Sequence, residues 1–190
     1  MLRPSIKFEI TAGGCILAAW MILALPSRLC ISILTAALVH ECCHICMLYK
    51  CKIPIYTIRI KTGSAEICCG PMSDLQEFLC SMAGPVGSFL CVFSFQRFPF
   101  FAICAFVQAV FNLLPIYPLD GGRMLYSIMH ALSERYCSIV CHISKNITLL
   151  GIFSLSIFGY FKTQLALFLI LPLIFIFKTQ AFRKTPCKEA

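Results

Sequence analysis

Two histidines and one glutamate at helical spacing are the residues whose types could do chemistry here. His40, Glu41 and His44 lie in the pentapeptide H-E-C-C-H, inside an apolar stretch from Leu29 to Tyr49. Residues four apart on a helix lie one above the other, so both imidazoles could bind one ion while the carboxylate points to the adjacent side. An H-E-x-x-H arrangement is typical of zinc hydrolases, in which the glutamate acts as general base.

The composition places these residues in a membrane. The 190 residues are 59% hydrophobic and 13% charged, with a mean hydropathy of +0.87, well above the average for a soluble domain. Since one span needs about 20 apolar residues, we expect an all-α polytopic membrane protein of about six transmembrane helices. The apolar runs lie at residues 11–26, 29–49, 75–95, 98–119, 146–161 and 164–177.

The positive charges indicate a topology rather than a nucleic-acid partner, because they form no single basic stripe. With six spans and a cytoplasmic N-terminus, thirteen of the sixteen Lys and Arg residues fall on inside segments, and only Arg28, Arg97 and Lys162 fall outside. That bias predicts a multi-pass protein of the cell membrane with both termini in the cytoplasm. His44 would then face the cytoplasmic side.

One connecting segment has strand character. Between residues 52 and 70, Tyr56, Ile58 and Ile60 alternate with polar residues before a turn sequence, which predicts a small cytoplasmic β-hairpin between the second and third helices. Asp74 is expected to be the N-cap of the third span. A short amphipathic helix should follow Arg123, and residues 134–145 could lengthen the fifth span.

A helix break near residue 115 supplies a further candidate ligand. The segment from Asn112 to Arg123 contains two prolines and two glycines, and broken backbone at membrane depth is tolerated only where protein or a wet cavity surrounds it. Asn112 and Asp120 are therefore expected to face such a cavity. A catalytic zinc ion needs three protein ligands, and Asp120 is the natural third, with His130 and His142 as weaker substitutes.

The fourteen cysteines mostly lie in predicted spans, where free cysteine behaves as a small apolar residue. Cys43 is three residues from His40, so a structural zinc site that uses this thiolate is an alternative use of the segment. We interpret Cys42 and Cys43 as apolar fillers. The role of Cys46 is left open.

The motifs together resemble those of the site-2 proteases, the intramembrane zinc metalloproteases. H-E-C-C-H matches the H-E-x-x-H of that family, Asn112 to Gly121 matches its N-x-x-P-x-x-x-L-D-G element, and Ala83-Gly84-Pro85 matches a weaker third signature. The resemblance covers about residues 30–160 and is closest to the compact six-span branch that includes the stage IV sporulation protease. Ser88 departs from the family, which often has Asn there.

The resemblance implies roles for the candidate residues. His40, His44 and Asp120 would hold Zn²⁺, Glu41 would be the general base, and Asn112 would hydrogen-bond the substrate or intermediate. The substrate would be a membrane-tethered protein, such as a sigma or anti-sigma factor precursor in regulated intramembrane proteolysis. Regulatory membrane proteins would be further partners. One protease domain, residues 1–190, is expected, without a CBS or PDZ domain.

Two other interpretations stay open at this point. A non-proteolytic zinc-binding or transport protein could use His40, Cys43 and His44, although transport predicts polar groups on several spans. A catalytically inactive scaffold could sequester membrane clients. If the chain is a protease, the edge of the 52–70 hairpin could bind an unwound substrate segment as an added strand, and prolines at Ile58 or Ile60 should lower cleavage.

Overall fold

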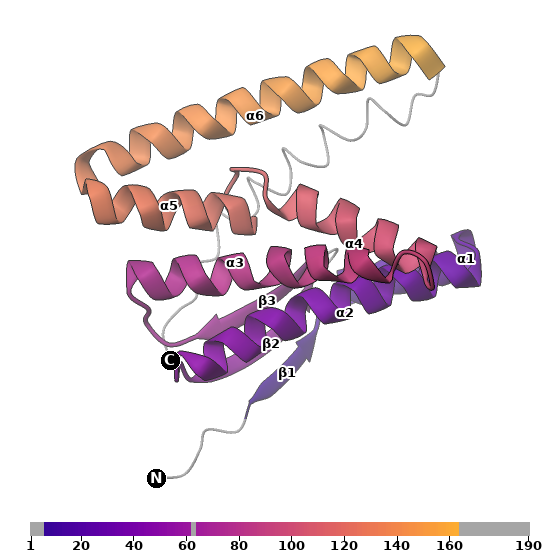
Figure 1. Ribbon diagram of the computed structural model, residues 1–190, viewed down its shortest axis with the longest axis horizontal. Coiled ribbons are helices and arrows are strands. Elements are labelled where there is room, and N and C mark those ends of the chain that lie inside the picture. Colours follow the sequence, from indigo (N-terminus) through magenta and orange to yellow (C-terminus); the bar gives the residue numbers. More distant parts are fainter. Residues whose placement is uncertain (1–5, 62–63, 164–190) are drawn as a thin grey trace. The chain divides into compact units, whose positions relative to one another are not determined.

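A computed structural model describes residues 6–61 and 64–163, and this part of the chain is mostly helical with one small sheet (Figure 1). The prediction of a helical protein with a short β-hairpin is confirmed. The chain divides into two compact units, Met1–Asn112 and Leu113–Ala190. Each unit is described by itself.

The helices of the first unit pack around α2. This helix (Ser27–Lys50) contacts both α3 (Asp74–Leu90) and α4 (Pro99–Asn112), and these two also contact each other. Helix α1 (Ala12–Ala24) precedes α2, and a short 3₁₀ helix, Cys91–Ser94, follows α3. The pentapeptide therefore lies on a helix that packs against both α3 and α4.

Three described helices are long and apolar enough to cross a bilayer: α2, α3 extended to Ser94, and Glu134–Gly159. Helices α1 and α4 have 13 and 14 residues, which at 1.5 Å per residue gives about 20 Å, less than the hydrocarbon core of about 30 Å. The count of six spans stays a prediction. Its last member, residues 164–177, lies outside the described residues.

The predicted hairpin forms the larger part of the sheet. Strand β2 (Ile55–Lys61) pairs antiparallel with β3 (Ser64–Cys69). The structure adds a strand that the sequence analysis missed, β1 (Lys7–Ile10), which pairs in parallel with β2. The order is β1-β2-β3, so the strand that carries Ile58 and Ile60 is the central one.

A row of charges crosses the sheet. Glu9, Arg59 and Glu66 are register partners on the three strands, and Arg59 lies 2.7 Å from Glu9 and 3.6 Å from Glu66. The hydrogen bond from Arg59 to Glu9, with the charge of that carboxylate, raises the pKa of the guanidinium above its usual value. Lys61 adds a contact of 2.7 Å to Glu66, so opposite charges fix the strand register.

The start of α3 differs by one residue from the prediction. The N-cap is Ser73, whose hydroxyl accepts from the backbone N–H of Gln76, while the Gln76 side chain accepts from the Ser73 N–H. This reciprocal pair is a capping box. Asp74 is instead the first helical residue, where its negative charge still suits the helix dipole.

The second unit begins with the predicted helix break. Residues 113–119 form a tight turn, after which α5 (Asp120–Leu132) and α6 (Glu134–Thr163) run as two contacting helices. A Cβ on Gly121 would collide with the carbonyl oxygen of Leu113, so the start of α5 lies directly against the start of the turn. As predicted, residues 134–145 extend the apolar helix that follows them.

Candidate active site

The two imidazoles of the pentapeptide are buried and face each other. His40 is 2% exposed and His44 is 8% exposed, and their Nε2 atoms lie 3.2 Å apart. Their spacing of four residues on α2 produces this arrangement, as the sequence predicted. Two ring nitrogens at this distance offer adjacent ligand atoms to a single ion.

Gly84 of α3 forms the surface opposite these nitrogens. A Cβ at this position would collide with Nε2 of His44 and would lie 2.7 Å from Nε2 of His40. The glycine therefore keeps open the space in front of both ligand atoms. One turn further along α3, Gly87 faces Sγ of Cys43 in the same way, so this thiol packs against the helix as a small apolar side chain.

Hydrogen bonds fix the outer nitrogen of each ring. Nδ1 of His44 lies 2.7 Å from the backbone oxygen of Cys80, and because a carbonyl only accepts, Nδ1 carries the proton and Nε2 carries a lone pair. Nδ1 of His40 lies 2.9 Å from Oγ of Ser88, which is 1% exposed. A hydroxyl can accept this proton too, which gives Nε2 of both rings the lone pair that a metal ligand needs.

The geometry of the pair fits a tetrahedral zinc site. Zinc–nitrogen bonds of about 2.0–2.1 Å at a tetrahedral angle place two ligand nitrogens about 3.3 Å apart, close to the 3.2 Å between the Nε2 atoms. Two such lone pairs repel each other unless a proton or a cation lies between them. The donor atoms, their spacing and the space that Gly84 leaves therefore suit a bound cation.

Two more predicted site residues belong to the first unit. Asn112 ends α4, and its side-chain Nδ2 lies 3.2 Å from Nε2 of His40. Glu41 follows His40 on α2 and is half-buried. The structure thus brings an amide and two imidazoles together and keeps the carboxylate on the same helical turn.

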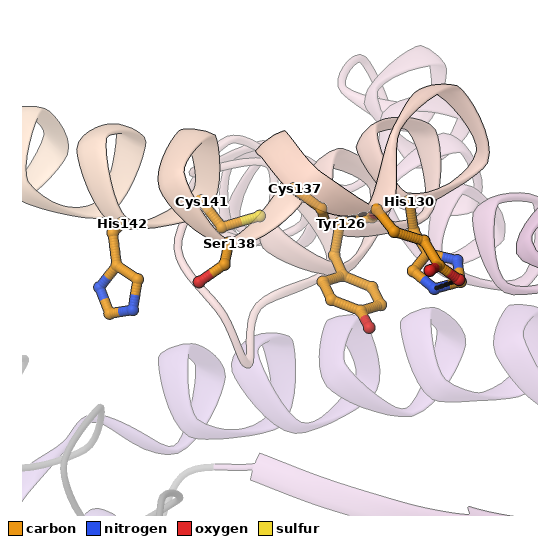
Figure 2. Close-up of a pocket in the computed structure, with 7 residues that line it drawn as sticks. Tyr126, His130, Cys137, Ser138, Cys141 and His142 are labelled. Atoms are coloured by element: carbon orange, nitrogen blue, oxygen red, sulfur yellow. Dashed lines mark hydrogen bonds and ion pairs between the residues drawn. The ribbon is translucent and has the colours of Figure 1, made fainter.

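The remaining predicted residues lie in the second unit. Asp120 is the first residue of α5. His130 and His142, the predicted substitutes for it, line a cavity between α5 and α6 (Figure 2). The same cavity is lined by further ionisable side chains, namely Tyr126, Glu134, Cys137 and Cys141.

Sequence reasoning missed the groups that orient the imidazoles. Ser88 was noted only as a departure from a family pattern, and the carbonyl of Cys80 leaves no trace in the sequence because every residue has one. A helical pattern over residues 80–88 that places Cys80, Gly84 and Ser88 on one face could have indicated that face as the partner of the pentapeptide.

The comparisons with known proteins agree with this geometry. The model of peptidase family M50 matches residues 81–158, which include Gly84, Asn112 and Asp120 and exclude the pentapeptide. No curated protein matches the sequence. Among solved structures, the site-2 protease from Methanocaldococcus jannaschii superposes with a TM-score of 0.69 at 15% identity, over 100% of this chain and 97% of that chain.

At 15% identity, that superposition shows a shared fold. The family model adds a match in sequence, and the H-E-x-x-H pair outside the matched region adds the ligand arrangement. Residues 81–158 therefore match peptidase family M50 in sequence, and the chain shares the fold of a site-2 protease, and both findings support a metalloprotease.

Proposed function

We propose that the chain is a membrane-embedded metalloprotease of the site-2 protease type, which uses zinc to hydrolyse a peptide bond in or near the transmembrane segment of a membrane-tethered protein, such as a sigma or anti-sigma factor precursor. The observation that carries the proposal is the 3.2 Å separation of two buried Nε2 atoms on a helix of membrane-spanning length. Residues 1–190 would act as one protease domain.

Asp120 is proposed as the third ligand, since His40, His44 and Asp120 each offer an atom of the kind that zinc binds. Contacts within each unit and the continuity of the chain support this choice. Asn112 contacts His40 and is bonded to Leu113, while Gly121 packs against the Leu113 carbonyl. Because Asp120 directly precedes Gly121, it lies near Leu113, the residue that the chain joins to Asn112.

The protein residues would share the proton transfers and the binding of substrate. When bound, zinc would lower the pKa of a water molecule toward about 7 and polarise the scissile carbonyl. Glu41 would take the proton of that water and return it to the leaving amine. The Asn112 amide would donate a hydrogen bond to the carbonyl oxygen as it gains negative charge.

The orientation in the cell membrane is also proposed. Lys and Arg residues are concentrated on the segments expected to be cytoplasmic, which supports cytoplasmic termini and an active site near the inner surface. Many described apolar side chains are exposed, among them Ile31, Leu34 and Leu38 of α2. A bilayer would cover these groups.

A sheet edge is the proposed place for the unwound substrate. Strand β1 covers one side of β2, and no described strand pairs with the outer side of β3. An extended segment could add at β3 through main-chain hydrogen bonds. Prolines at Ile58 or Ile60 would instead break the central strand, so they would disturb the sheet as well as the edge.

The deciding experiment compares the wild type with Glu41→Gln after reconstitution with a tethered candidate substrate. We expect the variant to retain zinc and to cleave about 10²–10⁴-fold more slowly, since it lacks the general base. Glu77→Gln, in the first turn of α3, is the matched control and should cleave normally. Equal cleavage by wild type and Glu41→Gln would exclude the proposed role of this carboxylate.

A further inference from the structure

A group of ionisable side chains that the proposed protease mechanism does not use lines a cavity in the second unit. A cavity of about 270 Å³ is lined by residues of α5 and α6 (Figure 2). Two of them are thiols at helical spacing, Cys137 and Cys141, and the others include two imidazoles. The lining residues are Tyr126, His130, Glu134, Cys137, Ser138, Cys141 and His142.

The two thiols form a pair. Cys137 is 3% exposed, and its thiol donates a hydrogen bond to the backbone oxygen of Tyr126 over 3.6 Å, while the Cys141 thiol interacts with the Cys137 thiol. Figure 2 draws the sulfur of Cys141 on the side toward Cys137. Both cysteines therefore line the same cavity, one helical turn apart on α6.

The helical spacing of Cys137 and Cys141 does not allow a disulfide bond between them. Residues four apart on a helix have Cβ atoms about 5–6 Å apart, whereas a disulfide needs about 3.5–4.5 Å. A metal ion removes that restriction, because metal–sulfur bonds of about 2.3 Å allow one ion to join sulfurs up to about 4.6 Å apart. The helix can thus chelate an ion through these thiols without bending.

The cavity lies on the polar part of α6. This helix has 30 residues, about 45 Å at 1.5 Å per residue, and so exceeds a hydrocarbon core of about 30 Å by about ten residues. Its first part carries Glu134, Arg135, His142 and Lys145, and its later part is apolar. The thiol pair consequently belongs at the membrane surface, where an ion can reach it from water.

We propose that Cys137 and Cys141 bind one monovalent copper ion, Cu⁺, through ligands that the proposed zinc site does not use. Thiolates select soft ions such as Cu⁺ and zinc, and zinc sites normally take at least three protein ligands. Two thiols suit an ion that accepts low coordination. Binding releases the two thiol protons to solvent.

Occupancy of this site would affect the helix that carries Asp120. Helix α5 begins at Asp120, and Tyr126 and His130 on the same helix line the cavity. An ion bound to α6 at this cavity would replace the hydrogen bond from Cys137 to the Tyr126 carbonyl. Copper binding to α6 would in this way change a contact between α6 and α5.

The test measures Cu⁺ affinity of the zinc-loaded, detergent-purified full chain under reducing, oxygen-free conditions, by competition with a chromophoric Cu⁺ chelator. We expect one tightly bound Cu⁺ per chain. Cys141→Ser, at a half-buried position, removes one of the two ligands. It should therefore weaken Cu⁺ binding by more than about tenfold, the effect of losing only a hydrogen bond to a metal ligand. Cys137→Ser should do the same, and X-ray absorption should show sulfur neighbours around the copper.

A matched control tests whether Cu⁺ binding needs the cavity or only two thiols four residues apart on a helix. Cys42 and Cys46 are also four apart on a helix, and both are exposed, so Cys46→Ser should leave Cu⁺ binding unchanged. Unaltered affinity in Cys141→Ser, loss of copper in Cys46→Ser, or equal displacement of copper by Zn²⁺ would each overturn the proposal. Proteolytic activity is not the readout, so the result is independent of the proposed protease mechanism.

Discussion

The imidazole of His44 donates its Nδ1 proton to the backbone carbonyl oxygen of Cys80 over 2.7 Å. The acceptor is part of the main chain, so no side-chain substitution at Cys80 removes it. His40 has a side-chain acceptor instead, Ser88, at 2.9 Å. A point mutation can therefore remove the hydrogen-bond acceptor that orients His40, whereas the main-chain acceptor that orients His44 remains after any substitution at Cys80.

Replacing Ser88 by Ala should weaken zinc binding by about 10–100-fold, as is typical when a supporting hydrogen bond to a ligand histidine is lost. Competition with a chelator measures the change. Ser127→Ala is the control, because Ser127 is also buried but bonds to carbonyls of its own helix. Equal zinc affinity in the Ser88 variant and the wild type would mean that the hydroxyl does not orient His40.

Adding one methyl group at Gly84 should abolish zinc binding while the protein stays folded. The new Cβ would occupy the space in front of both Nε2 atoms, at an overpacking cost of about 1–3 kcal/mol. Gly151→Ala is the matched substitution, since no atom lies within 4 Å of its added Cβ. Zinc content and thermal unfolding of both variants check the prediction, and a Gly84→Ala protein with full zinc would contradict it.

Asp120→Asn should lower zinc content and cleavage together, because a neutral amide oxygen binds a divalent cation less tightly than a carboxylate. Asp74→Asn changes the same chemical group in the first turn of another helix and should retain zinc. If Asp120→Asn keeps full zinc occupancy, the third ligand lies elsewhere, and His130→Gln and His142→Gln become the next variants to analyse.

Proline substitutions in β3 should distinguish the loss of a hydrogen-bond donor at the open edge from the loss of a hydrogen bond within the sheet. Consecutive residues of an antiparallel strand direct their N–H groups to opposite sides, so one of Ile67→Pro and Cys68→Pro removes an inner donor and the other removes an outer one. We expect the outer-donor variant to retain zinc and fold but to cleave a tethered substrate more slowly. Normal cleavage by a folded variant of each kind would exclude strand addition at β3.

Local patterns account for what the sequence could predict. The pentapeptide indicates two neighbouring imidazoles, because helical spacing alone brings His40 next to His44. The hairpin follows from alternation around a turn, and the break after Asn112 follows from proline and glycine. In each case residues close in sequence determine the geometry.

The missed features depend on partners far away in the sequence. Strand β1 has only four residues, and its partner β2 lies fifty positions later, so alternation of Phe8 and Ile10 was too short to indicate a strand. Ser73 and Asp74 are both good N-caps, and only the reciprocal contact with Gln76 distinguishes them. The contact of Ser88 with His40 joins residues 48 positions apart.

The parallel strand at the start of the chain has a practical consequence for anyone who shortens the protein. Residues 7–10 cover one side of β2, so a truncation beyond Ile10 would replace the four-residue edge strand β1 by the seven-residue strand β2 as an open edge of the sheet. Unpaired strand edges recruit other chains. Such a truncated protein should self-associate, and the newly exposed edge of β2 would compete with β3 for any extended peptide offered to it.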